Sequence, residues 1–250
     1  MLIKLYEKRE IKMKKKIMTG MMVGLVSASI IACGGSGKGT ETQKTTQAIE
    51  TAQETVAETQ DIVMVDSGYS VTTNSSGDKY LYYGAVVSNP NKDLAAQFPK
   101  ITITAKAEDG SVIATHEQTL FFIAPDDTVS NGGLIDCKGV DPSSVEFSVS
   151  SDFVPGDSDG IIHSSNLVVG NTPEFTNEYG VSSYTGEVEN ISGADIDTVS
   201  LTVILKQDGN IIYGYNGYID DVAAGSKKAF EISAYNVPDH TEYIITAQTW

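Results

Sequence analysis

The clearest pattern along the chain is an alternation of apolar and polar residues with a period of two. The apolar positions are Ile101, Ile103 and Ala105 in one segment and Val199, Leu201, Val203 and Leu205 in another. In the second segment Ser200 and Thr202 lie on the opposite side. Because successive side chains of a strand point to opposite faces, both segments are predicted to be half-buried strands.

An Asp-Gly pair closes each alternating segment. Asp109-Gly110 follows the first and Asp208-Gly209 follows the second, and further β-rich sequence comes after each pair. This is the short-range signal for a tight hairpin turn. No amphipathic helix pattern appears after residue 60, and turn signals recur roughly every eight to twelve residues, as in an all-β domain.

The two segments belong to a longer internal repeat with an offset of about 100 residues. Residues 84–89 and 101–110 match residues 186–190 and 199–209, and weaker matches join 62–65 to 167–169 and 142–149 to 238–245. The alternative is chance similarity between β-rich segments. Since the blocks occur in the same order in both copies, we favour a duplication.

We therefore predict an all-β fold with two tandem antiparallel β-sandwich domains of the immunoglobulin-like kind. Residues 61–153 form the first, 154–164 a linker and 165–250 the second. The predicted core residues are Val86, Ile101, Ile103, Val112, Phe121, Phe147, Val188, Leu201, Val203, Ile211, Phe230 and Ile245.

The N-terminal region has the layout of a signal peptide. Residues 17–31 are apolar or small and follow a cluster of four lysines. A membrane-spanning helix needs about 20 apolar residues, so residues 1–32 are predicted to be a signal peptide rather than a permanent span. Met13, followed by three lysines, is a better expected start than Met1.

The tetrapeptide Ile30-Ile31-Ala32-Cys33 resembles the lipobox of bacterial lipoproteins. The resemblance implies lipid attachment at Cys33 and an anchor on the extracytoplasmic face of the cell membrane. The alternative is an ordinary secretory signal cleaved near Ala32, which leaves a free thiol. With lipid on Cys33, the second cysteine of the chain, Cys137, has no partner for an intramolecular disulfide.

Composition changes after the cysteine. Residues 33–60 are rich in Thr, Gln and Glu, with only Ile49 and Val56 as large aliphatic residues. Such a segment cannot bury a core, and we predict a disordered tether. The whole chain has a formal net charge of −16. An acidic chain is repelled by phosphate backbones, so no nucleic-acid partner is expected.

The repeated block, Gly-x-Val-x-Asn, a turn, an alternating strand and Asp-Gly, resembles the FxLYD-type immunoglobulin-like repeats of Gram-positive lipoproteins. Residues 202–206 stand where the second copy could carry that string. The resemblance implies a surface module, often without assigned activity. Gly84 and Gly186 suit close approach of another segment, and Asn89 and Asn190 are expected to cap turns with their side chains.

Residues for catalysis or metal binding are scattered. His116, His163 and His240 have no metal-ligand spacing, so we predict no enzyme activity, no metal and no cofactor. Cys137 is predicted to be a core or edge residue, with a nucleophile activated by Lys138 as the alternative. In the linker, Asp157 and Asp159 offer oxygen ligands for calcium, but a solvated linker is favoured.

Tyr213, Tyr215 and Tyr218 form the densest aromatic cluster. Tyrosines exposed along a strand can stack on a sugar or pack against a peptide, so they are the candidate ligand-binding residues. The alternative is cross-strand packing within the fold.

The predicted function is a membrane-anchored, non-catalytic binding or spacer element of the cell envelope, with an envelope protein or a cell-wall glycan as partner. The alternative is an accessory subunit of a surface transporter or envelope machine, and a hydrolase is less favoured. A hydrolase predicts a concave pocket with convergent polar side chains, an accessory subunit a contiguous apolar patch, and a spacer neither.

Overall fold

A computed structural model describes residues 58–178 and 181–250. The predicted signal peptide, Cys33 and nearly all of the predicted tether lie outside these residues. Residues Thr55–Trp250 form one compact unit. No helix in the described part of the chain is long and apolar enough to cross a membrane.

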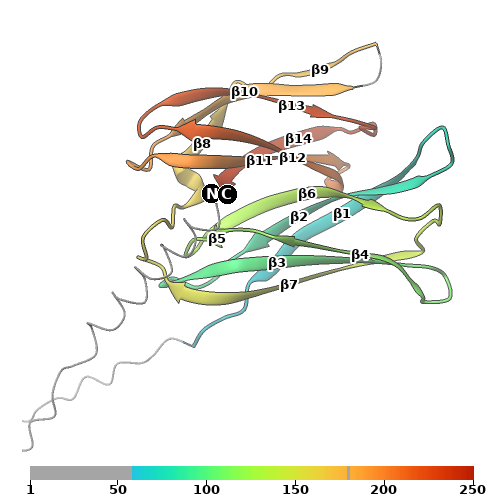
Figure 1. The fold of residues 1–250 in the computed structure, drawn as a ribbon, viewed down its shortest axis with the longest axis horizontal. Coiled ribbons are helices and arrows are strands. Elements are labelled where there is room, and N and C mark those ends of the chain that lie inside the picture. The colour runs from blue at the N-terminus through green and yellow to red at the C-terminus, as the bar shows by residue number, and fades with distance from the viewer. Residues whose placement is uncertain (1–57, 179–180) are drawn as a thin grey trace, which may run out of the picture. The chain divides into compact units, whose positions relative to one another are not determined.

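Strands make up almost all of the regular structure of the described residues (Figure 1). In the first half these are β1 (Val63–Thr73), β2 (Lys79–Ser88), β3 (Leu94–Lys106), β4 (Val112–Thr119), β5 (Phe122–Ile123), β6 (Thr128–Asp136) and β7 (Ser144–Pro155). In the second half a short 3-10 helix, η1 (Ser164–Asn166), precedes β8 (Leu167–Gly170), β9 (Glu174–Thr176), β10 (Ser182–Asn190), β11 (Ile196–Gln207), β12 (Asn210–Val222), β13 (Lys227–Ala234) and β14 (Glu242–Thr249). All strand pairs are antiparallel. The predicted all-β class with antiparallel sheets is confirmed.

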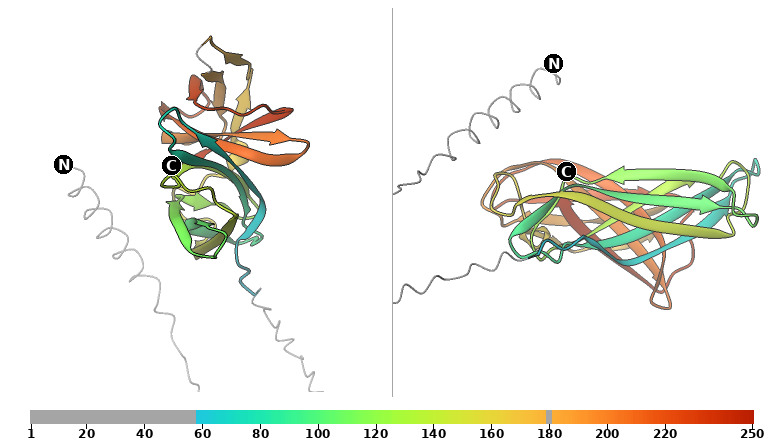
Figure 2. Two further views of the ribbon diagram at one scale, coloured as in Figure 1. Left: turned by 90° about the vertical axis from the view of Figure 1, so that its right-hand side faces the viewer. Right: turned by 90° about the horizontal axis from the view of Figure 1, so that it is seen from below.

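The strands form four sheets, which we number by layer. Sheet 1 contains β4, β3, β5 and β7, and sheet 2 contains β1, β2 and β6. Sheet 3 contains β12, β11 and β14, and sheet 4 contains β13, β10, β8 and β9. One apolar core lies between sheets 1 and 2 and another between sheets 3 and 4. Sheets 2 and 3 face each other, so the layers follow in numerical order (Figures 1 and 2).

The junction between sheets 2 and 3 is made by direct contact of their backbones. A Cβ atom on Gly132 of β6 would lie 2.2 Å from the carbonyl carbon of Gly214 on β12, and one on Gly68 of β1 would lie 1.8 Å from the Ile211 oxygen. No side chain fits at these positions. Strands β1 and β6 can approach β12 this closely only because glycine has no Cβ.

Polar groups also join the two halves. The Thr202 hydroxyl donates to the Ser130 carbonyl at 3.0 Å, and the Gly132 N–H donates to Asn216 Oδ1 at 3.0 Å. Lys206 Nζ lies 3.0 Å from an Asp66 carboxylate oxygen. These contacts satisfy polar groups that the junction removes from water. The two halves therefore share an interior beyond their separate cores.

Several predicted details are confirmed. Ile101, Ile103 and Ala105 are fully buried, as are the four apolar positions of β11. Gly110, Asp208 and Gly209 have positive φ angles, and the two Asp-Gly pairs lie in the turns between β3 and β4 and between β11 and β12.

The two predicted capping asparagines are fully buried. The Asn89 side-chain amide donates to the carbonyls of Leu94, Ile123 and Ala124, and that of Asn190 donates to the carbonyls of Ala194 and Val222. The side-chain oxygen of each asparagine accepts a hydrogen bond from the backbone N–H of the residue two positions later in the chain. Both asparagines cap their turns, as predicted.

Four expectations about burial were wrong. Val112 is 59% exposed because it follows directly after the β3–β4 turn, where a bulge shifts the register. Phe121 is exposed in the connection before β5, and Val86 is only half-buried, with Val87 in the core instead. Finally, β11 is not half-buried, since sheet 2 covers the face that carries Ser200 and Thr202.

Candidate functional site

Five aromatic side chains gather where the rim of the junction meets sheet 1, and we call them the rim cluster. They are Phe98, Phe121, Phe122, Tyr218 and Trp250. Phe121 and Phe122 have ring centroids 4.5 Å apart, and Phe98 lies about equally far from both, at 6.0 and 6.1 Å. Exposed fractions are 44% for Phe98, 36% for Phe121, 50% for Tyr218 and 42% for Trp250.

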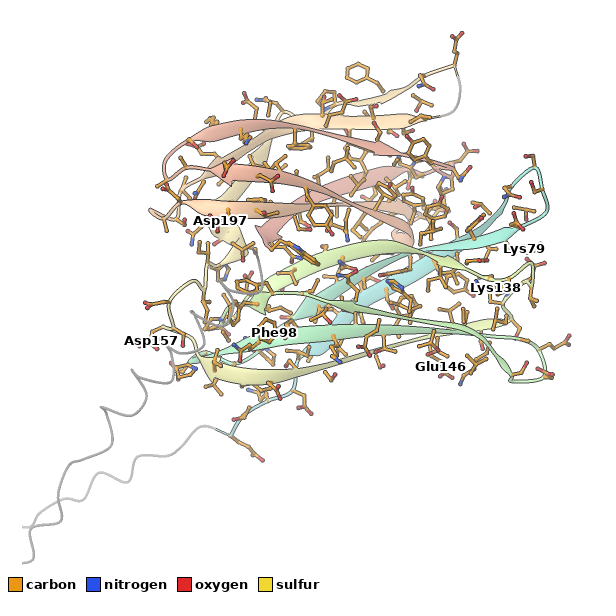
Figure 3. All side chains as sticks on the ribbon, viewed as in Figure 1. Lys79, Phe98, Lys138, Glu146, Asp157 and Asp197 are labelled. Carbon is orange, nitrogen blue, oxygen red and sulfur yellow. The ribbon has the colours of Figure 1, made fainter. Side chains whose placement is uncertain are left out.

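Phe98 is positioned by a bulge in β3 (labelled in Figure 3). Its φ angle is +49°, in the left-handed region that residues other than glycine, asparagine and aspartate rarely adopt. Two backbone hydrogen bonds hold the bulge: Phe98 N–H donates to Phe121 O at 3.0 Å, and Leu120 N–H donates to Pro99 O at 2.8 Å. Strained backbone of this kind is concentrated at functional sites.

Tyr218 and Trp250 come from sheet 3. Tyr218 on β12 and Gln248 on β14 both pair with Ser200 on the central strand β11. Trp250 follows β14, and its N–H donates to the Thr198 carbonyl at 3.0 Å. The Tyr218 and Trp250 rings meet edge to face at 5.4 Å, so their contact spans β11 from one neighbouring strand to the other.

A small crevice connects the two parts of the rim cluster. It has a volume of about 120 Å³ and is lined by Thr119, Leu120, Phe121 and Trp250. Ligand pockets that enclose a whole small molecule usually measure about 300 Å³ or more. The crevice can therefore accept a substituent but not a whole ring system, and a larger ligand would lie over the exposed rings.

Two polar side chains lie in the covered part of sheet 3 beside the cluster. Ser200 is fully buried and Gln248 is 5% exposed, yet Ser200 Oγ and both Gln248 amide atoms have no hydrogen-bond partner among the described residues. Alternate residues of a strand share a face, so Gln248 points to the same side of sheet 3 as Trp250. Buried polar groups without partners are uncommon and costly.

The three candidate tyrosines do not form one exposed surface. Tyr213 is fully buried, its ring stacks on Tyr82 of β2 at 4.7 Å, and its hydroxyl donates to the Tyr235 carbonyl. Burial raises the pKa of the Tyr213 hydroxyl far above its usual value. Tyr215 packs half-buried against the same core. Both therefore match the packing alternative, and Tyr218 alone of the three belongs to the rim cluster.

The other four members of the rim cluster were missed as site residues. One signal was available, since Phe121 and Phe122 are adjacent and neighbouring side chains of an extended segment point to opposite sides. The two phenylalanines therefore could not both have entered one core. Trp250 carries no such signal, because its neighbours in the crevice come from the other half of the chain.

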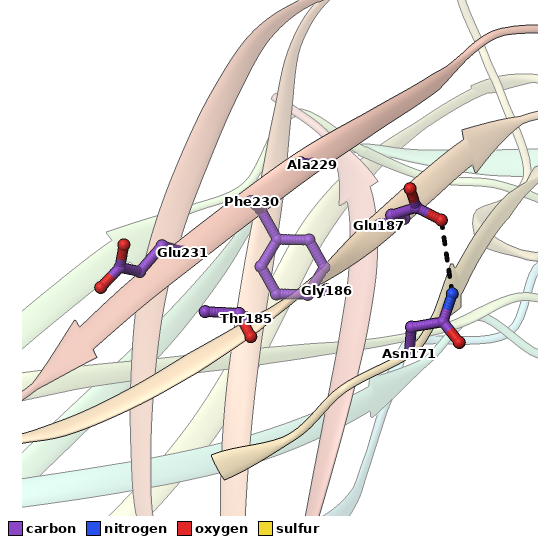
Figure 4. A pocket seen from close by; sticks show the side chains of 7 residues that line it. All are labelled: Asn171, Thr185, Gly186, Glu187, Ala229, Phe230 and Glu231. Carbon is purple, nitrogen blue, oxygen red and sulfur yellow. Dashed lines mark hydrogen bonds between the residues drawn. The ribbon is translucent and has the colours of Figure 1, made fainter. Parts of the chain in front are cut away.

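A second hollow lies on sheet 4 (Figure 4). It is open, has a volume of about 660 Å³, and is lined by Asn171, Thr185, Gly186, Glu187, Ala229, Phe230 and Glu231. Asn171 Nδ2 donates to a Glu187 carboxylate oxygen at 3.3 Å. A Cβ on Gly186 would lie 2.6 Å from the Phe230 ring, which explains the glycine. Among the described residues no group of three His, Cys, Asp or Glu side chains could hold a metal ion.

An Asp-His-Ser group lies beside η1, but its geometry is that of a cap. His163 Nδ1 is 2.8 Å from Ser165 Oγ and 3.5 Å from Asp127 Oδ1. A catalytic relay needs the serine and the aspartate on different ring nitrogens. Asp127 also accepts hydrogen bonds from the Ser164 N–H and hydroxyl. The group therefore fastens η1 to the first half.

The remaining candidates from the sequence are Cys137 and the pair Asp157 and Asp159. Cys137 is buried in the first core, and burial, followed by the Asp136 charge, raises the pKa of its thiol. Lys138 lies 2.7 Å from Asp136 instead of activating the thiol. The core interpretation of Cys137 thus holds. Asp157, labelled in Figure 3, and Asp159 are exposed on the link that follows β7.

Comparison with known proteins assigns no family. No family model matches the chain, and no curated protein matches it. The chain is similar to the crystal structure of red sea bream transglutaminase at 9% identity and a TM-score of 0.23, covering 72% of this chain and 29% of that one. The C-terminal globular domain of an oligosaccharyltransferase from Pyrococcus abyssi gives 7% identity and a TM-score of 0.24, covering 69% and 38%. A calcium-binding mutant of Bacteroides uniformis β-glucuronidase 2 gives 16% identity and a TM-score of 0.20, covering 66% of this chain and 23% of that one. The chain thus spans well under half the length of each of these structures.

Proposed function

We propose that the protein is a non-catalytic binding element of the cell envelope, anchored by lipid on Cys33, and that the rim cluster is its contact surface. The anchor rests on the lipobox-like sequence Ile30–Cys33 and the signal-peptide layout before it. Two or more acyl chains hold a protein firmly at a membrane, whereas one chain binds weakly. Residues 34–60 would then link the anchor to the β-structure.

The observation that carries the proposal is the exposure of four large aromatic rings within one cluster. Single exposed apolar residues are common, but a contiguous group marks an interaction surface. Aromatic residues also dominate the energetics of protein and ligand interfaces. Here the rings are fixed in place, by a hydrogen-bonded bulge in the case of Phe98 and by the strands of sheet 3 in the case of Tyr218 and Trp250.

The same observation favours a second candidate function, an accessory subunit of a surface transporter or envelope machine. That function requires a contiguous apolar surface for a protein partner, and the rim cluster offers one. The two candidates share the contact surface and differ in the chemistry of the partner.

The test is retention of the full chain on arrays of cell-wall glycans and envelope proteins. A triple variant, Phe121→Ser, Tyr218→Ser and Trp250→Ala, should weaken retention more than tenfold, because each lost aromatic contact at an interface costs roughly 1–2 kcal/mol. The matched control carries Phe175→Ser and Tyr235→Ser, two exposed aromatic residues outside the cluster. Equal retention of the triple variant and the wild type would contradict the proposed surface.

The anchor is tested separately with Cys33→Ala. This variant should move from the membrane fraction to the soluble fraction, because no thioether can form at residue 33. Mass spectrometry of the wild-type N-terminus should show the added lipid. Unchanged membrane retention without lipid mass would contradict the anchor and leave the binding surface as a separate question.

A further inference from the structure

We infer that a second copy of this chain docks on the hollow of sheet 4 with the outer face of its own sheet 1, in the way that sheet 3 packs on sheet 2 within one chain. The outer face of sheet 1 is represented by Lys100, Thr102, Thr104 and Lys106 of β3, which alternate with the buried residues of that strand. The two faces belong to the first and the last layer and do not include the rim cluster. The inference therefore goes beyond the proposed function and does not rest on it.

Sheets 2 and 4 occupy equivalent places in the two halves. The Asn89 N–H donates to the Asp127 carbonyl, and the Asn190 N–H donates to the Ser226 carbonyl, each at 2.9 Å. The first bond joins the end of β2 to the start of β6, and the second joins the end of β10 to the start of β13. Counting along the strands from these two bonds gives the corresponding residues, which are Gly84 and Thr185, Val86 and Glu187, Ser130 and Ala229, and Gly132 and Glu231.

Sheet 3 covers this part of sheet 2. A Cβ on Gly84 would lie 2.9 Å from the Ile204 side chain, and the Ser130 carbonyl accepts the hydrogen bond of Thr202. On sheet 4 the four counterparts line the open hollow of about 660 Å³ (Figure 4). The hollow therefore lies at the place where the first half receives a sheet.

The outer face of sheet 1 corresponds to the face of sheet 3 that packs there. β3 and β11 carry the same bulge, with a register shift before Lys106 in one strand and before Lys206 in the other, so the two lysines correspond. In the junction Lys206 Nζ lies 3.0 Å from an oxygen of Asp66, and Asp66 pairs with Val86. The counterpart of Val86 is Glu187. In a second copy docked in the same way, Lys106 would lie beside Glu187.

The charges of the two faces are complementary. Among the described residues neither Glu187 nor Glu231 pairs with a lysine. Lys100 and Lys106 form exposed ion pairs within sheet 1, at 2.9 and 2.6 Å. Exposed pairs are weak, so these lysines can turn to the carboxylates of a partner, and complementary charges fix the register of a contact. The net charge of −16 repels a second copy at long range, but physiological salt screens that repulsion beyond about 8 Å.

The contact between two copies is wider than the junction within one chain. Glu231 stands where Gly132 allows β12 to approach sheet 2, so the backbones of two copies cannot meet as closely. Side chains make the contact, and ion pairs contribute more to it than apolar burial does. Because the two faces differ, every docked copy leaves one face of each kind free at the ends. Such a heterologous contact gives an open chain of copies instead of a closed dimer.

The experiment is sedimentation equilibrium of the full chain between about 10 µM and 1 mM, a range that covers weak contacts. The weight-average mass should rise with concentration and should not level off at the dimer. Lys106→Glu and Glu187→Lys should each weaken the association at least tenfold, because each variant places like charges opposite each other.

Combining the two substitutions tells a direct contact from an indirect effect. The chain with both substitutions should associate again, and an equimolar mixture of the two single variants should associate although neither does so alone. The matched control is Lys92→Glu, which lies exposed between β2 and β3 outside both faces and should behave as the wild type. Unchanged thermal midpoints would show that all variants are folded.

Three results would overturn the inference. The first is a monomer at every concentration, and the second is a mass that levels off at the dimer. The third is association that persists in both single variants, which would place the contact on other surfaces. None of these results bears on the proposed function, which is tested through the rim cluster and Cys33.

Discussion

The strands β3 and β11 occupy equivalent places in the two halves but different surroundings. Each is followed by its hairpin partner, β4 or β12, and each also pairs with the last strand of its half, β7 or β14. One face of β3 is on a core and Thr102 and Thr104 of the other face remain partly exposed. In β11 both faces are covered, with Thr202 and Ile204 buried at the junction.

The difference shows that the halves do not pack through equivalent sheets. The first half presents sheet 2, built around β2, and the second half presents sheet 3, built around β11. A contact between unlike surfaces is heterologous, so the residues that make it differ between the two halves. The glycines of sheet 2 and the small polar residues of β11 belong to the junction. The matching sequence pattern of the two halves does not indicate that these residues are in contact.

The largest effect is expected for Gly214→Ala. The added Cβ would lie 2.5 Å from the Tyr83 carbonyl oxygen and within 2.9 Å of two further backbone atoms, those of Gly84 and Gly132. Backbone cannot move aside cheaply, so the free energy of unfolding should fall by about 4 kcal/mol or more. Urea denaturation followed by circular dichroism measures it.

Gly170→Ala is the control for this substitution. Gly170 ends β8, has no positive φ angle, and nothing lies within 4 Å of its added Cβ. The free energy of unfolding of this variant should differ from that of the wild type by no more than about 0.5 kcal/mol. Similar losses in both variants would show that the close contact at Gly214 does not determine stability.

The next largest effect on stability is expected when one substitution, threonine to lysine, is made at the equivalent positions of β11 and β3. Thr202→Lys places a charge in the junction and removes the hydrogen bond to Ser130, so the free energy of unfolding should fall by about 3–5 kcal/mol. Thr102→Lys places the same charge on a partly exposed face, opposite Glu117, and should cost at most about 0.5 kcal/mol. Thermal and urea unfolding of both variants provide the measurement, and equal losses would refute the asymmetry between β3 and β11.

This asymmetry also shows how far the sequence could predict the fold. Period-two alternation identified the core-facing sides of β3 and β11 because that signal depends only on residues within one strand. It could not indicate that Ser200 and Thr202 are covered, since the covering residues, such as Gly132 and Ser130, come from the other half. The hairpin turns and the two capping asparagines were predictable for the same reason as the strands, as their chemistry is local.

The candidate site was less predictable because it is assembled from distant segments. Phe98 joins the rim cluster through a bulge, and Trp250 contacts the first half only after the sheets have packed. Tyr213 lies only five residues before the exposed Tyr218 in sequence but is buried and stacks on Tyr82 of the other half. Aromatic density along the chain therefore pointed to a region in which only Tyr218 is a surface residue of the cluster.

A smaller difference in the free energy of unfolding is expected between alanine variants of the two capping asparagines. Asn89→Ala leaves the buried carbonyls of Leu94, Ile123 and Ala124 without their donor, whereas Asn190→Ala affects the carbonyls of Ala194 and Val222. Buried groups that lose a partner cost about 1–3 kcal/mol each when water cannot replace it. Both variants should therefore reduce the free energy of unfolding by at least about 2 kcal/mol, with the larger loss at Asn89, where one more carbonyl loses its donor. A larger loss at Asn190 in urea titrations would mean that the two turns are not equivalent in energy.

The smallest effect concerns alkaline pH and compares the two cores. Burial raises the pKa of the Cys137 thiol in the first core and of the Tyr184 and Tyr213 hydroxyls in the second, from ordinary values of 9.0 and 10.0. The unfolded chain releases these protons at lower pH than the folded chain does. The stabilisation is therefore complete below the ordinary pKa and is lost as pH rises toward the folded-state values. Because the thiol titrates first, the fall in stability between pH 9 and 10 should be shallower in Cys137→Ala than in the wild type, although the variant is less stable at every pH through loss of packing. Urea midpoints measured at several pH values give the two slopes, and identical slopes would show that the thiol titrates alike in both states.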